Sequence, residues 1–105
     1  DRDTLTVLSL RGDLLAGDAD AFRRAALDRF EARVRDFVLD AARLEAIDSK
    51  GLETLLWLKD EAEDRLGQVR LARAPEHLRT ILACTRLAAR LECADTVDDA
   101  VGSLR

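Results

Sequence analysis

The sequence contains little of several residue types that mark particular protein classes. Its 105 residues include two cysteines and one proline, and aromatic residues make up only 4% of the chain. So few cysteines exclude a disulfide-rich scaffold, and the core must be built mainly from aliphatic side chains. No uncharged apolar run approaches the roughly 20 residues that cross a bilayer, and no signal peptide is visible. We therefore expect one globular domain in the cytoplasm, without membrane insertion.

The charge balance bears on the kind of partner. The chain has 21 acidic and 17 basic residues, which gives a net charge of −4. Nucleic acids bind basic surfaces, so direct nucleic-acid binding is not expected. Cys84 and Cys93 both lie in apolar patterns. This pattern favours buried free thiols over a disulfide.

Segments of strand character alternate with segments of helical character along the chain. Strand patterns occur at 5–10, 37–39, 69–71 and 91–93. Helical spacing of apolar residues occurs at 19–30, 52–66, 75–85 and 97–104. Arg11-Gly12-Asp13 and Asp40 are expected to end the first two strands, and Gly67 the second helix. This order predicts a largely parallel sheet covered by helices. The expected core of the sheet is Leu8, Leu10, Val38, Leu39 and Leu71.

The residue patterns of common enzymes are missing. The sequence has no phosphate-binding loop, no dinucleotide fingerprint and no nucleophile elbow. His77, the one histidine, is expected on the surface, and two cysteines with one distant histidine do not make a zinc site. Asp13 and Asp40 each follow a strand, but no lysine comes after Lys59 to complete a phospho-receiver site. We therefore predict a protein that is not an enzyme and uses no cofactor or metal.

The most informative segment, Asp48-Ser49-Lys50-Gly51-Leu52, lies where the second helix is expected to begin. One interpretation is structural: Asp48 or Ser49 caps the helix, and Gly51 allows a close approach of neighbouring backbone. The other is functional, because the free N–H groups of a helix start stabilise an anion. A phosphate on Ser49 would then alter the surface and leave the fold intact. Both interpretations stay open at this point.

The same segment carries a resemblance to a known family. Phe-Val-Leu-Asp at 37–40, followed by Leu-Glu-Ala-Ile-Asp-Ser-Lys-Gly-Leu at 44–52, resembles the signature of STAS domains, the sulfate transporter and anti-sigma factor antagonist family. The segments 10–14, 74–75 and 85–87 resemble other parts of the family pattern. The resemblance implies one α/β domain over residues 1–105. It implies a mixed sheet of four to five strands and about four helices, which mostly cover one face.

The resemblance also implies a regulatory protein that switches partners. In stand-alone bacterial members, an anti-sigma factor with serine kinase activity phosphorylates the serine after the signature Asp, which is Ser49 here. The unphosphorylated antagonist binds the anti-sigma factor, and a phosphatase resets the switch. A weak homodimer is compatible with this reading. The expected partner surface comprises Asp13, Leu14, Leu15, Asp48, Ser49, Lys50, Gly51, Glu53 and Thr54.

Three positions depart from the family pattern. Lys50 replaces the usual Ser or Thr, Leu15 replaces a frequent acidic residue, and Arg86 stands where glycine is common. Lys50 could partly neutralise a phosphate on Ser49 or change which kinase docks. Two alternatives therefore stay open. One is a non-phosphorylated docking subunit of a transporter or signalling scaffold, and the other is a module that binds a small molecule or nucleotide.

Overall fold

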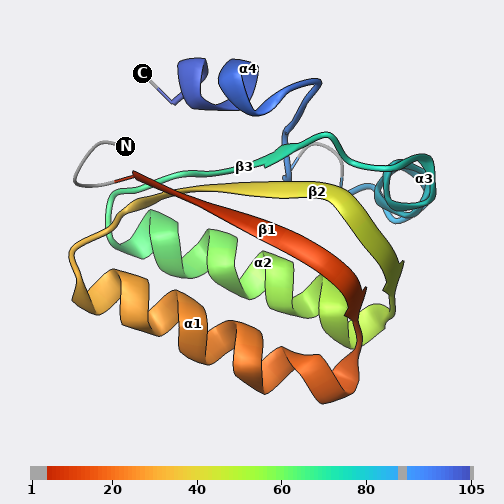
Figure 1. Ribbon diagram of the computed structural model, residues 1–105, viewed down its shortest axis with the longest axis horizontal. Coiled ribbons are helices and arrows are strands. Elements are labelled where there is room, and N and C mark those ends of the chain that lie inside the picture. Colours follow the sequence, from red (N-terminus) through yellow and green to blue (C-terminus); the bar gives the residue numbers. More distant parts are fainter. Residues whose placement is uncertain (1–4, 88–89, 105) are drawn as a thin grey trace.

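The computed structural model describes residues 5–87 and 90–104, and these form a four-stranded sheet with helices on both faces (Figure 1). The strands follow the order β1-β2-β3-β4, and all three pairings are parallel. The elements in chain order are β1 (Leu5–Leu14), the short 3-10 helix η1 (Ala16–Asp18), α1 (Ala19–Glu31), β2 (Asp36–Ile47), α2 (Ser49–Asp64), β3 (Val69–Ala72), α3 (Glu76–Cys84), β4 (Cys93–Ala94) and α4 (Val97–Gly102).

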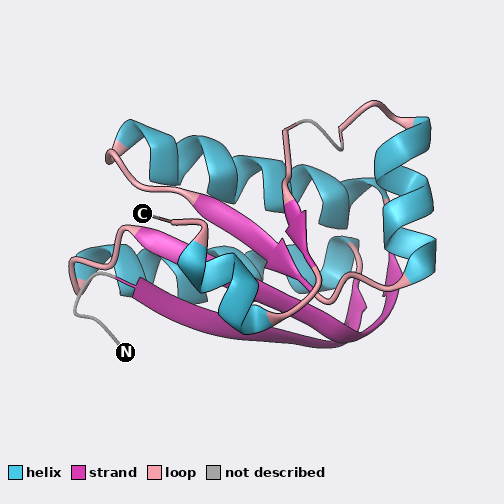
Figure 2. Cartoon of the chain, turned by 90° about the horizontal axis from the view of Figure 1, so that it is seen from above, coloured by secondary structure: helices cyan, strands magenta, loops and turns pink. Residues whose placement is uncertain are grey.

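The helices are divided unequally between the two faces of the sheet. The long helices α1 and α2 lie side by side beneath it, whereas α4 lies above it and α3 stands at one end (Figure 1). The view from above shows α4 lying across the strands (Figure 2). The predicted α/β fold with about four helices is confirmed. Three of them, α1, α2 and α3, pack on one apolar cluster and α4 on the other, so the helices mostly cover one face. The described strands are all parallel, which agrees with the alternation of strand and helix patterns. The resemblance had implied a mixed sheet, and the described strands do not form one.

Two apolar clusters hold the layers together, one on each face of the sheet. The larger lies between the sheet and α1 and α2, and the smaller lies beneath α4. Both faces of β1 are therefore covered, with Leu5 toward α4 and Leu10 toward α1 and α2. Of the expected core residues, Leu10, Val38, Leu39 and Leu71 are buried, and Leu8 is half-buried against the larger cluster.

The first two strands are longer than the sequence pattern predicted. Arg11-Gly12-Asp13 does not end β1, because two irregularities in the pairing with β2 absorb the change of register, and Gly12 takes a φ of 70° beside one of them. Asp40 does not end β2 either. Its carboxylate accepts a hydrogen bond from Arg73 Nε at 3.1 Å, and this contact lowers the pKa of the Asp40 carboxyl.

The prediction of buried thiols was wrong. Cys84 and Cys93 are both exposed and both free. Leu91 takes the buried position near the short strand β4, with no measurable exposure, while Cys93 faces outward. His77 is exposed on α3, as predicted.

The three longer helices all end with a residue other than glycine in the left-handed conformation. Each closes with paired backbone hydrogen bonds of the Schellman type, and each has a left-handed residue just beyond its last turn. That residue is Arg33 after α1, Leu66 after α2 and Arg86 after α3, with φ values of 70°, 66° and 62°. Glycine is the usual choice at this position. Leu66 therefore takes the helix-exit position that was predicted for Gly67. Gly67 is the next residue, and a Cβ atom on it would come within 1.9 Å of the Arg35 carbonyl oxygen.

Candidate functional site

Asp48 joins the beginning of α2 to the segment that follows β1. One carboxylate oxygen, Oδ1, accepts a hydrogen bond from the Gly51 N–H at 2.8 Å and so caps the helix. The other, Oδ2, accepts from the Ala16 N–H at 3.0 Å. Of the two capping residues that the sequence allowed, the structure selects Asp48. Both oxygens of this exposed side chain are thus used to fix the site.

These hydrogen bonds also set the protonation state of Asp48. The bond from the Gly51 N–H lowers the pKa of the carboxyl below its usual range, and the bond from Ala16 acts in the same direction. Donors of this kind favour the charged form of the acid. Asp48 is therefore a carboxylate near neutral pH, adjacent to the helix N-terminus that it caps.

Gly51 allows α2 to begin directly against the end of β1. A Cβ atom at this position would lie 2.0 Å from the carbonyl oxygen of Leu14. The same oxygen accepts a hydrogen bond from the Asp48 N–H at 3.4 Å. The close backbone approach predicted for this glycine is confirmed. It brings residues 13–16 and 48–51 together into one surface.

Ser49 is the first residue of α2, and its side chain is exposed. Within residues 5–87 and 90–104, no group hydrogen-bonds its hydroxyl. Lys50 beside it is also exposed and forms an ion pair with Glu53 at 3.5 Å. With 64% and 59% of the two side chains exposed, this pair contributes little to stability. Ser49 is accessible, and its substitution leaves the Asp48 cap in place.

The predicted partner surface divides into an exposed part and a buried part. The exposed members are Asp13, Asp48, Ser49, Lys50 and Glu53, and Leu15 is half-buried. Leu14, Gly51 and Thr54 were predicted at the surface but are buried, and Leu14 and Thr54 are 5% and 0% exposed. The Thr54 hydroxyl donates to the Lys50 carbonyl oxygen at 2.8 Å, which satisfies it inside the core.

Two features of this surface were not foreseen. The short helix η1 follows β1, and Asp18 at its end accepts a hydrogen bond from the Leu15 N–H at 2.9 Å. Asp18 also stands at the N-cap position of α1, but its side chain makes no hydrogen bond to that helix and instead fixes the start of η1. The backbone of Ala16 is the link to Asp48. A backbone donor has no sequence signature, so local pattern could not reveal this link.

The described residues contain no group of three or more His, Cys, Asp or Glu side chains arranged to hold a metal ion. None of the helices in residues 5–87 and 90–104 is long and apolar enough to cross a membrane.

A family model for the STAS domain matches residues 1–100. The chain belongs to the STAS domain family. No curated protein sequence matches it. The fold of this STAS domain is similar to that of a putative anti-sigma factor antagonist from Thermotoga maritima, with a TM-score of 0.90 and 21% identity over 99% of this chain and 90% of the other.

Two other solved structures show the range of relatives with this fold. The Bacillus cell fate determinant SpoIIAA in its phosphorylated form has a TM-score of 0.76 and 22% identity over 99% of this STAS domain and 94% of that protein. A sulfate transporter family protein from Wolinella succinogenes has a TM-score of 0.82 and 22% identity, covering 96% and 84%. At this level of identity, the likeness establishes the fold.

Proposed function

We propose that this STAS domain is a partner-switching regulator of the anti-sigma factor antagonist type, a binding protein and not an enzyme. In this proposal it binds an anti-sigma factor with serine kinase activity in the cytoplasm. Phosphorylation of Ser49 ends the binding, and a phosphatase restores it. The fold shared with SpoIIAA, whose phosphorylated form has been solved, supports this reading.

The observation that carries the proposal is the position of Ser49 beside its capping neighbour. Ser49 is exposed at the first residue of a 16-residue helix, while Asp48 supplies the cap with its own carboxylate. A phosphate on Ser49 would lie at the positive end of the helix dipole, where an anion is stabilised. The fold would therefore tolerate the modification.

The same phosphate would oppose binding for a separate reason. A partner that covers this surface must remove water from a group carrying a charge of about −1.5 to −2. Burying such a charge without compensation is costly. Lys50 is the next residue in the chain, so its ammonium group would offset part of the phosphate charge and weaken the switch. Replacing Lys50 with Ser should enlarge the difference in affinity between the two states.

The test is a comparison of partner affinities by calorimetry, with candidate kinase-type anti-sigma factors. Ser49→Asp should weaken binding in part, because it adds one charge and fewer oxygen atoms than a phosphate. Ser49→Ala should bind like the wild type but gain no phosphate, as measured by intact mass after incubation with the kinase. Because Asp48 is the cap, Ser49→Ala should also leave the melting temperature nearly unchanged. Equal affinities for all three proteins would contradict the phosphorylation switch.

A second candidate is a docking subunit of a transporter or signalling scaffold that is not phosphorylated. The likeness to the sulfate transporter family protein supports it, as does Lys50 at a position where Ser or Thr is usual. This candidate predicts binding to a membrane transporter that is indifferent to Ser49→Asp. The same calorimetric series therefore separates the two functions.

A further inference from the structure

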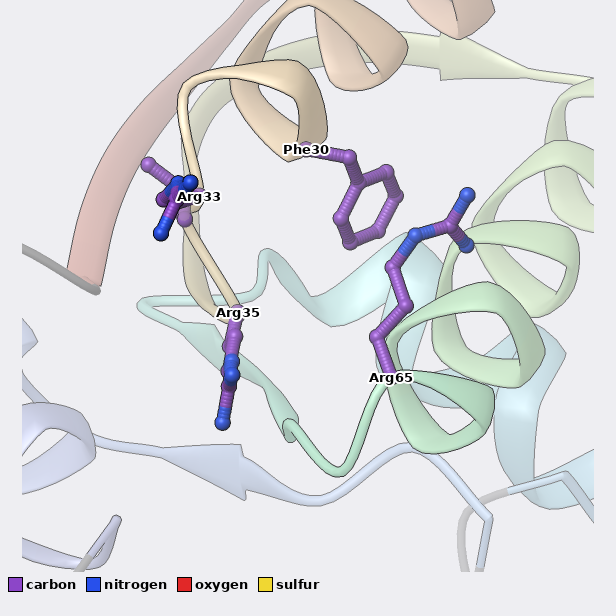
Figure 3. A pocket seen from close by; sticks show the side chains of 5 residues that line it. Phe30, Arg33, Arg35 and Arg65 are labelled. Carbon is purple, nitrogen blue, oxygen red and sulfur yellow. The ribbon is translucent and has the colours of Figure 1, made fainter.

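A second surface lies at the opposite end of α2 from Ser49. Ser49 begins this helix and Arg65 follows its last residue, so the two are separated by the helix length, roughly 24 Å. There the ends of α1 and α2 border an open hollow of about 570 Å³, lined by Phe30, Arg33, Val34, Arg35 and Arg65 (Figure 3). We call this hollow, together with the adjacent Leu66, the arginine hollow.

The arginine hollow has an apolar floor and a cationic rim. Phe30 and Val34 form the floor and are each 9% exposed. The Arg65 guanidinium lies 4.2 Å from the centroid of the Phe30 ring. It also donates a hydrogen bond from Nη1 to Glu61 Oε1 at 2.7 Å. This stacking holds one cation at the edge of the floor.

Two cations of the rim are not neutralised within the described chain. Arg33 and Arg35 are exposed on the segment between α1 and β2 (Figure 3). No ion pair formed by residues 5–87 and 90–104 includes either of them. The chain as a whole carries a net charge of −4, so this cationic cluster stands out. A ligand that complements it brings negative charge to the rim and carbon to the floor.

Leu66 directly follows Arg65 of this rim in the chain and belongs to neither apolar cluster of the described residues. It is 86% exposed and adopts a left-handed φ of 66°, at a position where glycine is the usual residue. A branched apolar side chain there adds backbone strain and gains no burial. Arg33, with a φ of 70°, is strained in the same way. Two of the three strained helix ends thus border one hollow, and retained strain of this kind is typical of functional sites.

We propose that the arginine hollow binds an acidic segment of a partner protein. An apolar side chain of that segment fills the hollow over Phe30 and Val34, flanking carboxylates pair with Arg33 and Arg35, and Leu66 packs against the segment. A small anion would leave the apolar floor uncovered, and a lipid surface does not enter a concave site. A second copy of this chain that docked through the same face would place like charges opposite each other. A protein segment satisfies both the charge and the shape.

The experiment begins with a random peptide library displayed on phage, with the wild-type protein as bait. Enriched sequences should carry Asp or Glu on both sides of an apolar residue. The best peptide is then synthesised, and its affinity is measured by calorimetry. Binding should weaken as sodium chloride rises from about 50 to about 500 mM, because exposed charge pairs are screened.

Three glycine substitutions give a matched comparison, because each relieves the same backbone strain. Leu66→Gly and Arg33→Gly should each weaken peptide binding about tenfold, the loss expected for a contact of one anchor side chain. Arg86→Gly, at the equivalent position after α3, should leave the affinity unchanged. All three variants should melt at or above the wild-type temperature. This combination separates a binding role from a structural one.

Several results would overturn the proposal. These are a library without enrichment, enriched peptides that lack acidic residues, or equal affinity of the three variants. Tighter binding to vesicles of phosphatidylglycerol than to the selected peptide would indicate a lipid surface instead. A lower melting temperature for Leu66→Gly would give Leu66 a role in folding. Ser49→Asp should not change the affinity for the selected peptide. Failure of the proposal for the arginine hollow would therefore not count against the switch at Ser49.

Discussion

Gly51 and Leu14 approach each other so closely that a Cβ atom on Gly51 would lie 2.0 Å from the Leu14 carbonyl oxygen. Leu14 is the last residue of β1 and Gly51 is in the first turn of α2. The oxygen belongs to the backbone of a paired strand, so it cannot move aside like the tip of a side chain. The position of the helix that carries Ser49 therefore depends on the absence of a side chain at residue 51.

Gly51→Ala should destabilise the protein and displace the start of α2. Forcing one extra carbon into a packed site costs about 1–3 kcal/mol, and this should appear in urea unfolding. Gly17→Ala is a matched control, because a Cβ atom at Gly17 meets nothing within 4 Å. Equal stability of the two variants would show that the contact relaxes freely.

Leu15→Asp should weaken binding of the proposed anti-sigma factor partner without unfolding the protein. Leu15 is half-buried next to η1, at the edge of the surface that Asp48 organises. Leu14→Asp should instead unfold the domain, because Leu14 is 5% exposed and would carry a charge into the core. Melting temperature and partner affinity, measured together, check both. A large loss of stability in Leu15→Asp would assign Leu15 to the core.

Stability should decrease in acid through Asp48 and Asp40. Hydrogen bonds lower the pKa of both carboxyls in the folded protein, from Gly51 to Asp48 and from Arg73 to Asp40. Their stabilising effect is present above the unfolded pKa of about 4 and is lost as the pH falls through the lower folded value. Urea midpoints measured from about pH 6 down to about pH 3 should therefore fall less for Asp48→Asn and Asp40→Asn than for the wild type.

If Asp48→Asn followed the wild-type curve, the two hydrogen bonds of Asp48 would make no net contribution to the acid sensitivity of folding.

Leu39→Ala should cost about 2–5 kcal/mol, the usual penalty for a buried leucine. Leu39 lies in β2 between its pairing partners Leu8 on β1 and Leu71 on β3, has no exposed surface and belongs to the larger apolar cluster. Leu27→Ala on α1 is the comparison, because Leu27 is 41% exposed. Denaturant unfolding gives both values. A loss below about 0.5 kcal/mol for Leu39→Ala would be inconsistent with its burial.

Much of the fold could be predicted from the sequence because apolar periodicity reports burial directly. The period of two in β1 placed Leu8 and Leu10 on one face, and the period of α1 placed Ala26 and Phe30 toward the core. The ends of β1 and β2 could not be predicted. Arg73 pairs with Asp40 from 33 residues away, and no local pattern reveals such a partner.

Part of the candidate site could also be predicted from the sequence. The types and spacing of Asp48 and Gly51 signal a capped helix and a close backbone approach, and both are present. The burial of Thr54 was not predictable, because its hydroxyl is satisfied by the Lys50 carbonyl within the helix. A threonine with an internal partner behaves as a core residue, although its type suggests a surface one.

The strand order β1-β2-β3-β4 has a consequence for synthesis on the ribosome. Among the strands that the structure describes, each one after β1 pairs with the strand that precedes it in the chain, so none of these pairings waits for a segment translated much later. The unit from Leu5 to Ile47 can close as soon as β2 emerges, and each later strand adds to an existing edge. Nascent chains arrested at successive lengths should therefore gain protease resistance in steps from the N-terminus.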